Sequence, residues 1–271
     1  MVGEVKVKPR PVPLARYKQL YFRRLNNVRL VAMVTRDALE AYSRQERMHI
    51  LPLPGHAAPR FHFVVPSAGK PTARISRDGK AMRRLLSEVR EEGEFRKSLV
   101  LAVSIAEDYL RNVMRLVLRA HPERLLGWEK GGPALTLPLV DFIRRDRQEV
   151  LEEQIRLRLE AILYARPREY LDRFKRIVKV DVPIATLEQF AEVKATRDVV
   201  VHAENVANDR YVGKAGSYAR ALPGQGLIVD SAYFDQALTV VKRLIGGIHD
   251  DLCARYADDE GIAKQAKRFI D

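Results

Sequence analysis

Cysteine is nearly absent from this chain of 271 residues, and Cys253 is the only one. A single thiol excludes an intramolecular disulfide framework and a zinc site built from several cysteines. Long apolar runs are also missing, since the longest candidates, such as residues 98–106, are about half of the ~18 residues that a membrane-spanning helix needs. Residues 1–13 lack the apolar segment of a secretory signal. We therefore expect a cytoplasmic protein that does not span a membrane.

Several ready-made catalytic motifs are absent as well. The segment Gly69–Lys70 does not belong to a phosphate-binding P-loop, because Val64 stands where that motif requires its first glycine. The histidines His49, His56 and His62 are spread across a predicted loop, and neither a cysteine nor a cluster of acids accompanies them. No serine or cysteine lies in a recognisable nucleophile context. We expect neither a metal ion nor a cofactor.

The chain has a large excess of positive charge, with a formal net charge of +13 at pH 7. Residues 1–47 carry eleven Lys or Arg against four Asp or Glu, a difference of +7. Such an excess attracts polyanions, and nucleic acid is the commonest one in the cytoplasm. The candidate nucleic-acid-binding residues on the first predicted helix are Arg16, Lys18, Arg23, Arg24 and Arg29. A solvated basic helix face without a ligand is the alternative.

Hydrophobic periodicity predicts an all-α chain. The most apolar helix, residues 95–119, is expected at the centre of a bundle, because apolar residues cover more than half of its circumference. Residues 60–66 alternate like a strand, but one strand cannot form a sheet alone, and the segment after it reads as a loop. Further helices are predicted at residues 14–48, 78–92, 139–165, 167–180, 187–204 and 231–256, with Gly93 interrupting the second and Asp230 or Ser231 capping the last.

The predicted organisation has three parts. Residues 1–93 form a basic, mostly helical N-terminal extension that includes a proline-rich arm and can pack on the rest. Residues 94–257 form a helical bundle, and residues 258–271 form a charged tail. A chain of this length can bury a sizeable core as one large domain or as two smaller ones.

An Arg followed by a His after four to six intervening residues recurs in this chain, so the spacing alone identifies no site. The four occurrences are Arg44/His49, Arg115/His121, Arg197/His202 and Arg243/His249. Only Arg197 projects from the middle of an apolar arc, that of the predicted helix 187–204. A charge at that position is costly unless it is paired, or unless the arc lines an interface or a ligand site.

Asp198 and His202 are four residues apart at the edge of the same arc. We therefore expect Asp198 to accept a hydrogen bond from the imidazole and to orient His202 as a general base. An arginine supplies an anion clamp and a histidine a proton carrier near neutral pH, which suits phosphodiester chemistry. Arg197 and His202 are about 140° apart at ~100° per residue. They converge only if Arg197 reaches round, the helix end loosens, or two copies of the chain contribute.

The segment Arg197–His202, reading RDVVVH, resembles the signature of the HEPN superfamily of small helical domains, many of which are RNases. That signature is an Arg, a polar residue, three mostly apolar residues and a His. Other segments look most like the RiboL-PSP-HEPN branch: residues 105–110, residues 165–174, the loop ending at Tyr211, and the entry to the last helix at residues 226–230. The resemblance covers about residues 94–257 and implies a HEPN-like helical bundle. Glu204 stands where some HEPN toxins carry a modifiable tyrosine, so that regulation is not expected here.

The resemblance implies a metal-independent endoribonuclease that cleaves RNA by attack of the 2′-hydroxyl at a homodimer interface. By position, Arg197 would clamp the scissile phosphate, His202 would be the general base or acid, and Asp198 would orient it. Supporting candidates are Glu107, which needs a partner and is expected to pair with Arg197, together with Lys194 and Asn205. The expected role is that of a toxin or phage-defence effector, and the expected partners are RNA, a second copy of the chain, and an antitoxin or defence-system protein.

The sequence leaves two alternatives open. Many HEPN domains are regarded as non-catalytic, so the bundle could serve only for nucleic-acid binding or dimerisation, with Arg197, Asp198 and His202 in a structural ion-pair network. An adaptor that binds a nucleotide or a protein partner, without affinity for nucleic acid, is the third reading. Salt-dependent binding of nucleic acid separates the last reading from the other two.

Overall fold

The computed structural model describes residues 12–49, 60–66, 68, 72–125, 144–163 and 167–268. These residues are mostly helical, as predicted, with one two-stranded hairpin in addition. None of the described helices is both long and apolar enough to cross a membrane. The elements in chain order are α1 (Val12–His49), β1 (Arg60–Pro66), β2 (Thr72–Asp78), α2 (Gly79–Glu88), η1 (Val89–Gly93), α3 (Glu94–Ala120), η2 (Pro122–Leu125), α5 (Arg147–Leu163), α6 (Pro167–Val178), α7 (Ile184–His202), α8 (Asp209–Ala215), η3 (Gly216–Tyr218), α9 (Ser231–Arg255) and α10 (Glu260–Arg268).

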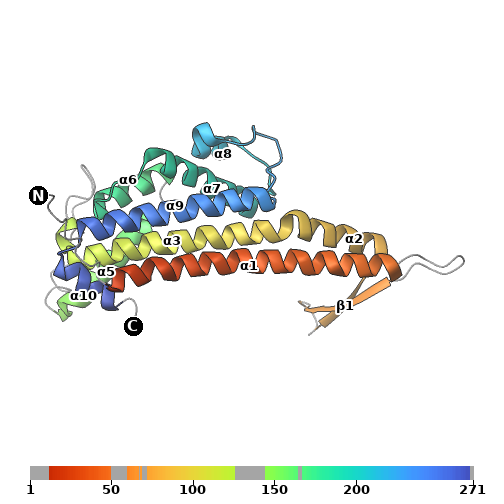
Figure 1. Ribbon diagram of the computed structural model, residues 1–271, viewed down its shortest axis with the longest axis horizontal. Helices are drawn as coiled ribbons and strands as arrows, with labels where there is room; N and C mark the ends of the chain where they lie inside the picture. Colours follow the sequence, from red (N-terminus) through yellow and green to blue (C-terminus); the bar gives the residue numbers. More distant parts are fainter. Residues whose placement is uncertain are drawn as a thin grey trace, which may run out of the picture.

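Three long helices, α1, α3 and α9, lie side by side along the long axis of the molecule (Figure 1). α3 contacts α1, α5, α6, α7, α9 and α10, which is the central position expected for the most apolar helix. α5 and α10 lie at one end of the bundle. The hairpin lies at the opposite end, beside α2 and the C-terminal part of α1 (Figure 1).

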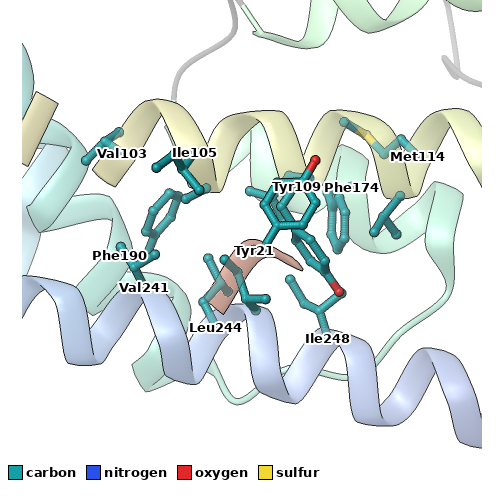
Figure 2. Packing of buried hydrophobic residues seen from close by; sticks show 14 of the residues in the cluster. Tyr21, Val103, Ile105, Tyr109, Met114, Phe174, Phe190, Val241, Leu244 and Ile248 are labelled. Atoms are coloured by element: carbon teal, nitrogen blue, oxygen red, sulfur yellow. The ribbon is translucent and has the colours of Figure 1, made fainter. Parts of the chain in front are cut away.

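One apolar core joins α1, α3, α6, α7 and α9 (Figure 2). Tyr21 of α1 meets Tyr109 of α3 edge-on, with ring centroids 5.1 Å apart. Phe174 of α6 and Phe190 of α7 are fully buried in the same core, and burying a side chain of this size contributes roughly 2–3 kcal/mol. Because α1 supplies side chains to this core, the basic N-terminal helix packs as one of the helices of the bundle.

α2, η1 and α3 form one helical run from Gly79 to Ala120. We expected Gly93 to interrupt it, but Gly93 keeps helical backbone angles (φ −59°, ψ −39°). The five residues Val89–Gly93 form a π-helical segment, which absorbs a local irregularity without ending the helix. The predicted boundary at residue 93 therefore falls inside a continuous helix.

The strand predicted at residues 60–66 is confirmed, and the prediction of a loop after it is wrong over Thr72–Asp78. The two strands pair antiparallel, from Arg60 opposite Asp78 to Pro66 opposite Thr72. The sequence TARISRD hides its strand character, because only Thr72 and Ile75 are β-branched and the rest is small or polar. Its pairing with β1 supplies the stabilisation that the segment lacks alone.

The predicted charged tail is wrong, because α10 packs against α1 and α3. Ile262 and Ala266, one helical turn apart, are buried in the main core. The Asp259 side chain accepts a hydrogen bond of 2.9 Å from the backbone of Ile262 and lies 2.7 Å from His121 Nε2. The apolar residues Ile262 and Ala266 therefore hold this charged segment against α1 and α3. Of the predicted helix 139–165, residues 139–143 and 164–165 lie outside the described residues. The helix that the structure describes in this segment is Arg147–Leu163.

Candidate functional site

α7 carries the Arg-His pair and is buried around most of its circumference. It begins after Pro183 and ends at His202, with Ala203 as the C-cap, because Glu204 and Asn205 adopt left-handed φ values of 50° and 64°. Four of its polar side chains are buried: Thr186, Glu192, Lys194 and Thr196. Each of them needs a partner inside the protein, so the contacts of α7 determine what its exposed end can do.

Glu107 of α3 is the partner of two cations on α7. Its Oε1 accepts a hydrogen bond of 2.8 Å from Arg197 Nη2 and a second hydrogen bond from Lys194 Nζ. The predicted pairing of Glu107 with Arg197 is confirmed. Lys194 also lies over the ring of Tyr170, with its Nζ 5.1 Å from the ring centroid. The guanidinium of Arg197 is therefore held in place from the side of α3.

Asp198 does not form the predicted hydrogen bond with His202. Its Oδ2 accepts a hydrogen bond of 2.7 Å from Lys214 of α8, and its Oδ1 lies 3.4 Å from Arg197 Nε. Bonds from a cationic donor to a carboxylate are about twice as strong as bonds between neutral groups. Because α8 packs against α7 and places Lys214 within reach, the lysine takes the carboxylate that we expected to orient the imidazole.

His202 lies exposed in the last turn of α7, and its ring has no hydrogen-bond or ion-pair partner within the described part of the chain. Its apolar neighbours Val201 and Val206 are also open to solvent, with exposed fractions of 49% and 41%. Within one chain, Arg197 faces Glu107 while His202 points to solvent. The structure therefore does not bring the two predicted catalytic side chains together in one copy.

Asn205 shapes the turn that ends α7. Its backbone carbonyl accepts a hydrogen bond of 2.7 Å from the backbone of Leu227, and the next residue forms a bridge with Gly226. Asparagine tolerates the left-handed conformation better than most residues. Its side-chain Oδ1 is buried and has no hydrogen-bond partner among the described residues. Asn205 thus fixes the path of the chain directly after His202.

A polar cluster around Glu192 was not predicted. The buried carboxylate of Glu192 accepts hydrogen bonds from four side chains: Thr196 (2.7 Å), Tyr233 (2.9 Å), Arg220 Nε (3.0 Å) and Tyr211 (3.1 Å). Arg220 also stacks on Tyr233, with Cζ 3.4 Å from the ring centroid. Burial raises the pKa of both tyrosines, so their hydroxyls remain donors. The sequence signal that could have predicted this cluster is Glu192, an acid within the apolar arc of α7 and one turn before Thr196.

The Glu192 cluster ties α7 to the segment between α8 and α9. Arg220 donates from its backbone to the hydroxyl of Tyr211 at 3.0 Å and from Nη1 to the carbonyl of Ile228 at 3.0 Å. Together with the Lys214–Asp198 contact, these bonds hold the residues after His202 against α7. The exposed imidazole therefore sits on a rigid support.

Three of the five basic residues that we expected to bind nucleic acid pair with acids of the bundle instead. The pairs are Lys18 with Asp250 (3.1 Å), Arg24 with Asp108 (2.9 Å), and Arg29 with Asp235 through two hydrogen bonds. The acids lie on α3 and α9, which flank α1, so these cations dock the helix. Arg16 and Arg23 are exposed, and neither has an ion-pair partner among the described residues.

No cluster of three or more His, Cys, Asp or Glu side chains within the described ranges is arranged to hold a metal ion. Of the three N-terminal histidines, His62 is described with its side chain, whereas the side chains of His49 and His56 lie outside the described residues. No family model, no curated protein and no solved structure matches this chain.

Proposed function

We propose that this protein is a metal-independent endoribonuclease, a homodimer whose composite active site combines Arg197 and His202 from its two copies. The observation that carries the proposal is the contrast between these two side chains. Arg197 is fixed by Glu107 and lies beside Asp198, whereas His202 is exposed and its ring is unpartnered within the described residues. An exposed histidine on a rigid support is suited to receive a proton from a bound substrate.

In the proposed reaction, one proton is removed from the attacking hydroxyl of the RNA and one proton is added to the leaving oxygen. A general base takes the proton of the 2′-hydroxyl, and the 2′-oxygen forms a bond to phosphorus. The bond from phosphorus to the 5′-oxygen breaks, and a general acid protonates that oxygen, leaving a 2′,3′-cyclic phosphate and a 5′-hydroxyl. In each site, His202 of one copy is the base, a water molecule donates the proton to the leaving 5′-oxygen, and Arg197 of the other copy stabilises charge on the phosphate oxygens.

The exposed apolar surface next to His202 supports a second copy of the chain as partner. Val201 and Val206 flank the histidine, with exposed fractions of 49% and 41%. Apolar side chains gathered at an exposed face are typical of protein interfaces. An antitoxin or a defence-system protein is the further partner that an effector of this kind would have.

The test is cleavage of RNA by the purified dimer in the presence of EDTA. We expect products with 2′,3′-cyclic phosphate ends, and a loss of at least about 100-fold in rate for His202→Ala, the usual range for a general acid or base. Glu204→Gln, two residues away and exposed, is the matched control and should cleave normally. Folded, dimeric wild-type protein that leaves all RNAs intact would refute the proposal.

One observation favours a second candidate function, a non-catalytic binding or dimerisation module. The charge of Arg197 is already balanced by Glu107 and lies beside Asp198, as in a structural ion-pair network. In that case RNA binding persists in Arg197→Ala and His202→Ala, and no cleavage accompanies it. Loss of cleavage with retained folding in either variant decides for the enzyme.

A further inference from the structure

The hairpin has one apolar face and one basic face. Opposite residues share a face, and successive residues alternate between faces, so Phe63 lies with Ile75 and Val64 lies with Arg74. The half-buried residues of the first face are Phe61, Val65, Ala73 and Ile75. Both strands contact α2, so this face is the one that the rest of the molecule shields. The other face presents Arg60, His62 and Arg74 to solvent.

Six cationic side chains gather in the hairpin and the first turns of α2: Arg60, Arg74, Arg77, Lys80, Arg83 and Arg84. All six are exposed, and none forms an ion pair with an acid among the described residues. Arg60 and Arg77 donate only to Ser76, to its hydroxyl at 3.1 Å and to its carbonyl at 3.3 Å. Their charges are therefore available to a ligand.

The one acid of this region, Asp78, is already engaged. Its side chain accepts a hydrogen bond of 2.7 Å from the backbone of Ala81 and so caps α2. That hydrogen bond is the main reason why the pKa of Asp78 lies below its ordinary value. The carboxylate balances one of six positive charges and leaves the hairpin strongly basic.

The cations of α1 show the opposite arrangement. Lys18, Arg24 and Arg29 each meet an acid on a neighbouring helix. Among the described residues, acids of the neighbouring helices therefore pair with the cations of α1, whereas Asp78 is the one acid of the hairpin and forms no ion pair with its cations. Charge of one sign that is exposed and uncompensated attracts a polyanion, and guanidinium groups bind phosphate through paired hydrogen bonds.

We propose that the basic face of the hairpin and the first turns of α2 bind the phosphate backbone of RNA at a site remote from His202. The choice of RNA among polyanions rests on the proposed endoribonuclease function, whereas the site itself rests on the hairpin charge. Gly79 and Glu107 lie on one helical run. Glu107 is 28 positions after Gly79, which corresponds to about 42 Å at ~1.5 Å per residue. An RNA must cover this distance to contact both sites.

The experiment measures binding of a labelled RNA to full-length protein that carries His202→Ala, so that cleavage does not consume the ligand. The test variant adds Arg60→Gln, Arg74→Gln and Lys80→Gln, two cations of the basic face and one in the first turn of α2. The matched control adds Arg147→Gln, Arg176→Gln and Lys264→Gln, three exposed cations without an ion-pair partner in the described chain, which change the net charge equally. Dissociation constants are measured over a series of salt concentrations, with circular dichroism as the check of folding.

We expect the test variant to bind at least about tenfold more weakly, and its salt slope to fall by about two units, for three lost contacts at ~0.7 each. The control should bind as its parent does.

Equal weakening of both variants would overturn the proposal, because net charge alone would then explain it. Tighter binding of DNA of the same sequence would overturn the choice of RNA. If the test variant lost binding to phosphatidylserine vesicles but kept its RNA binding, the hairpin would be assigned to a membrane surface instead. Wild-type protein that binds RNA through the hairpin and leaves it uncut would refute the endoribonuclease and retain this site.

Discussion

Lys214 donates a hydrogen bond of 2.7 Å to Asp198 and thereby ties α8 to the last turns of α7. The side chains of both residues are mostly buried, with exposed fractions of 16% and 25%. Asp198 therefore acts on the chain segment that follows His202 and not on the imidazole itself. In this arrangement Asp198 is a positioning residue.

Asp198→Asn and Lys214→Met should have similar effects, because both break the same contact. A hydrogen bond between charged groups contributes roughly 1.5–3 kcal/mol, and the double variant should lose little more than either single variant. Urea denaturation measures the free energies, and the pH dependence of RNA cleavage should keep its shape in both variants. A shift of the pH profile in Asp198→Asn alone would show that Asp198 orients His202 after all.

The Glu192 cluster predicts a large cost for removing Arg220. Arg220→Ala leaves a buried carboxylate without its cation, and breaking such a pair costs about 3 kcal/mol. The double variant Glu192→Gln/Arg220→Met should recover part of that loss, because no buried charge remains. Arg210→Ala, an exposed arginine on α8, is the control and should cost less than about 0.5 kcal/mol. An equally small cost in Arg220→Ala would mean that the cluster does not stabilise the fold.

The docking of α10 predicts an acid-sensitive contact between Asp259 and His121. Burial by itself would raise the pKa of Asp259, but hydrogen bonds from the backbone of Ile262 and from His121 outweigh it and hold the pKa below the ordinary 3.8. Glu123 faces the other ring nitrogen of His121 at 3.3 Å. A lowered carboxyl pKa stabilises the folded state above the unfolded pKa, and this stabilisation is lost as pH falls through the folded pKa.

Asp259→Asn should therefore cost about 1 kcal/mol near pH 7. The difference from wild type should shrink toward zero as the pH falls below ~3.8, the ordinary Asp pKa, because the wild-type carboxylate then becomes protonated. Urea denaturation at several pH values checks both parts. Glu260→Gln, on the exposed first turn of α10, should show no such dependence. A difference that stays constant with pH would contradict the role of the charge.

Local signals predicted the long helices and the cap of α9, but they missed the short helices α8 and α10. Asp230 caps α9 as expected, since its side chain accepts a hydrogen bond of 2.8 Å from the backbone of Tyr233. The pairing of Glu107 with Arg197 also followed from local patterns, because each charge lay against an apolar helix face and needed a partner. Amphipathic periodicity carries this information within single helices.

The parts that were missed depend on partners far along the chain. Lys18 meets Asp250 across 232 residues, and no local pattern indicates that a basic helix is docked by such pairs. Asp198 had two candidate donors, His202 and Lys214, and only the position of α8, which carries Lys214, decides between them. The second strand of the hairpin is likewise stabilised by its pairing rather than by its own composition.

A composite site makes a prediction about mixtures of inactive variants. If each active site takes Arg197 from one copy and His202 from the other, Arg197→Ala and His202→Ala are both inactive alone. A mixed dimer of the two variants has one site that lacks both residues and one site that is complete. Random exchange makes half of the dimers mixed, so the mixture should regain about one quarter of the wild-type activity. Val201→Glu places a charge in the exposed apolar surface beside His202, so it should prevent both dimerisation and this recovery. A mixture that exchanges subunits, as shown by mass, and still cleaves no RNA would place Arg197 and His202 in the same copy or outside the reaction.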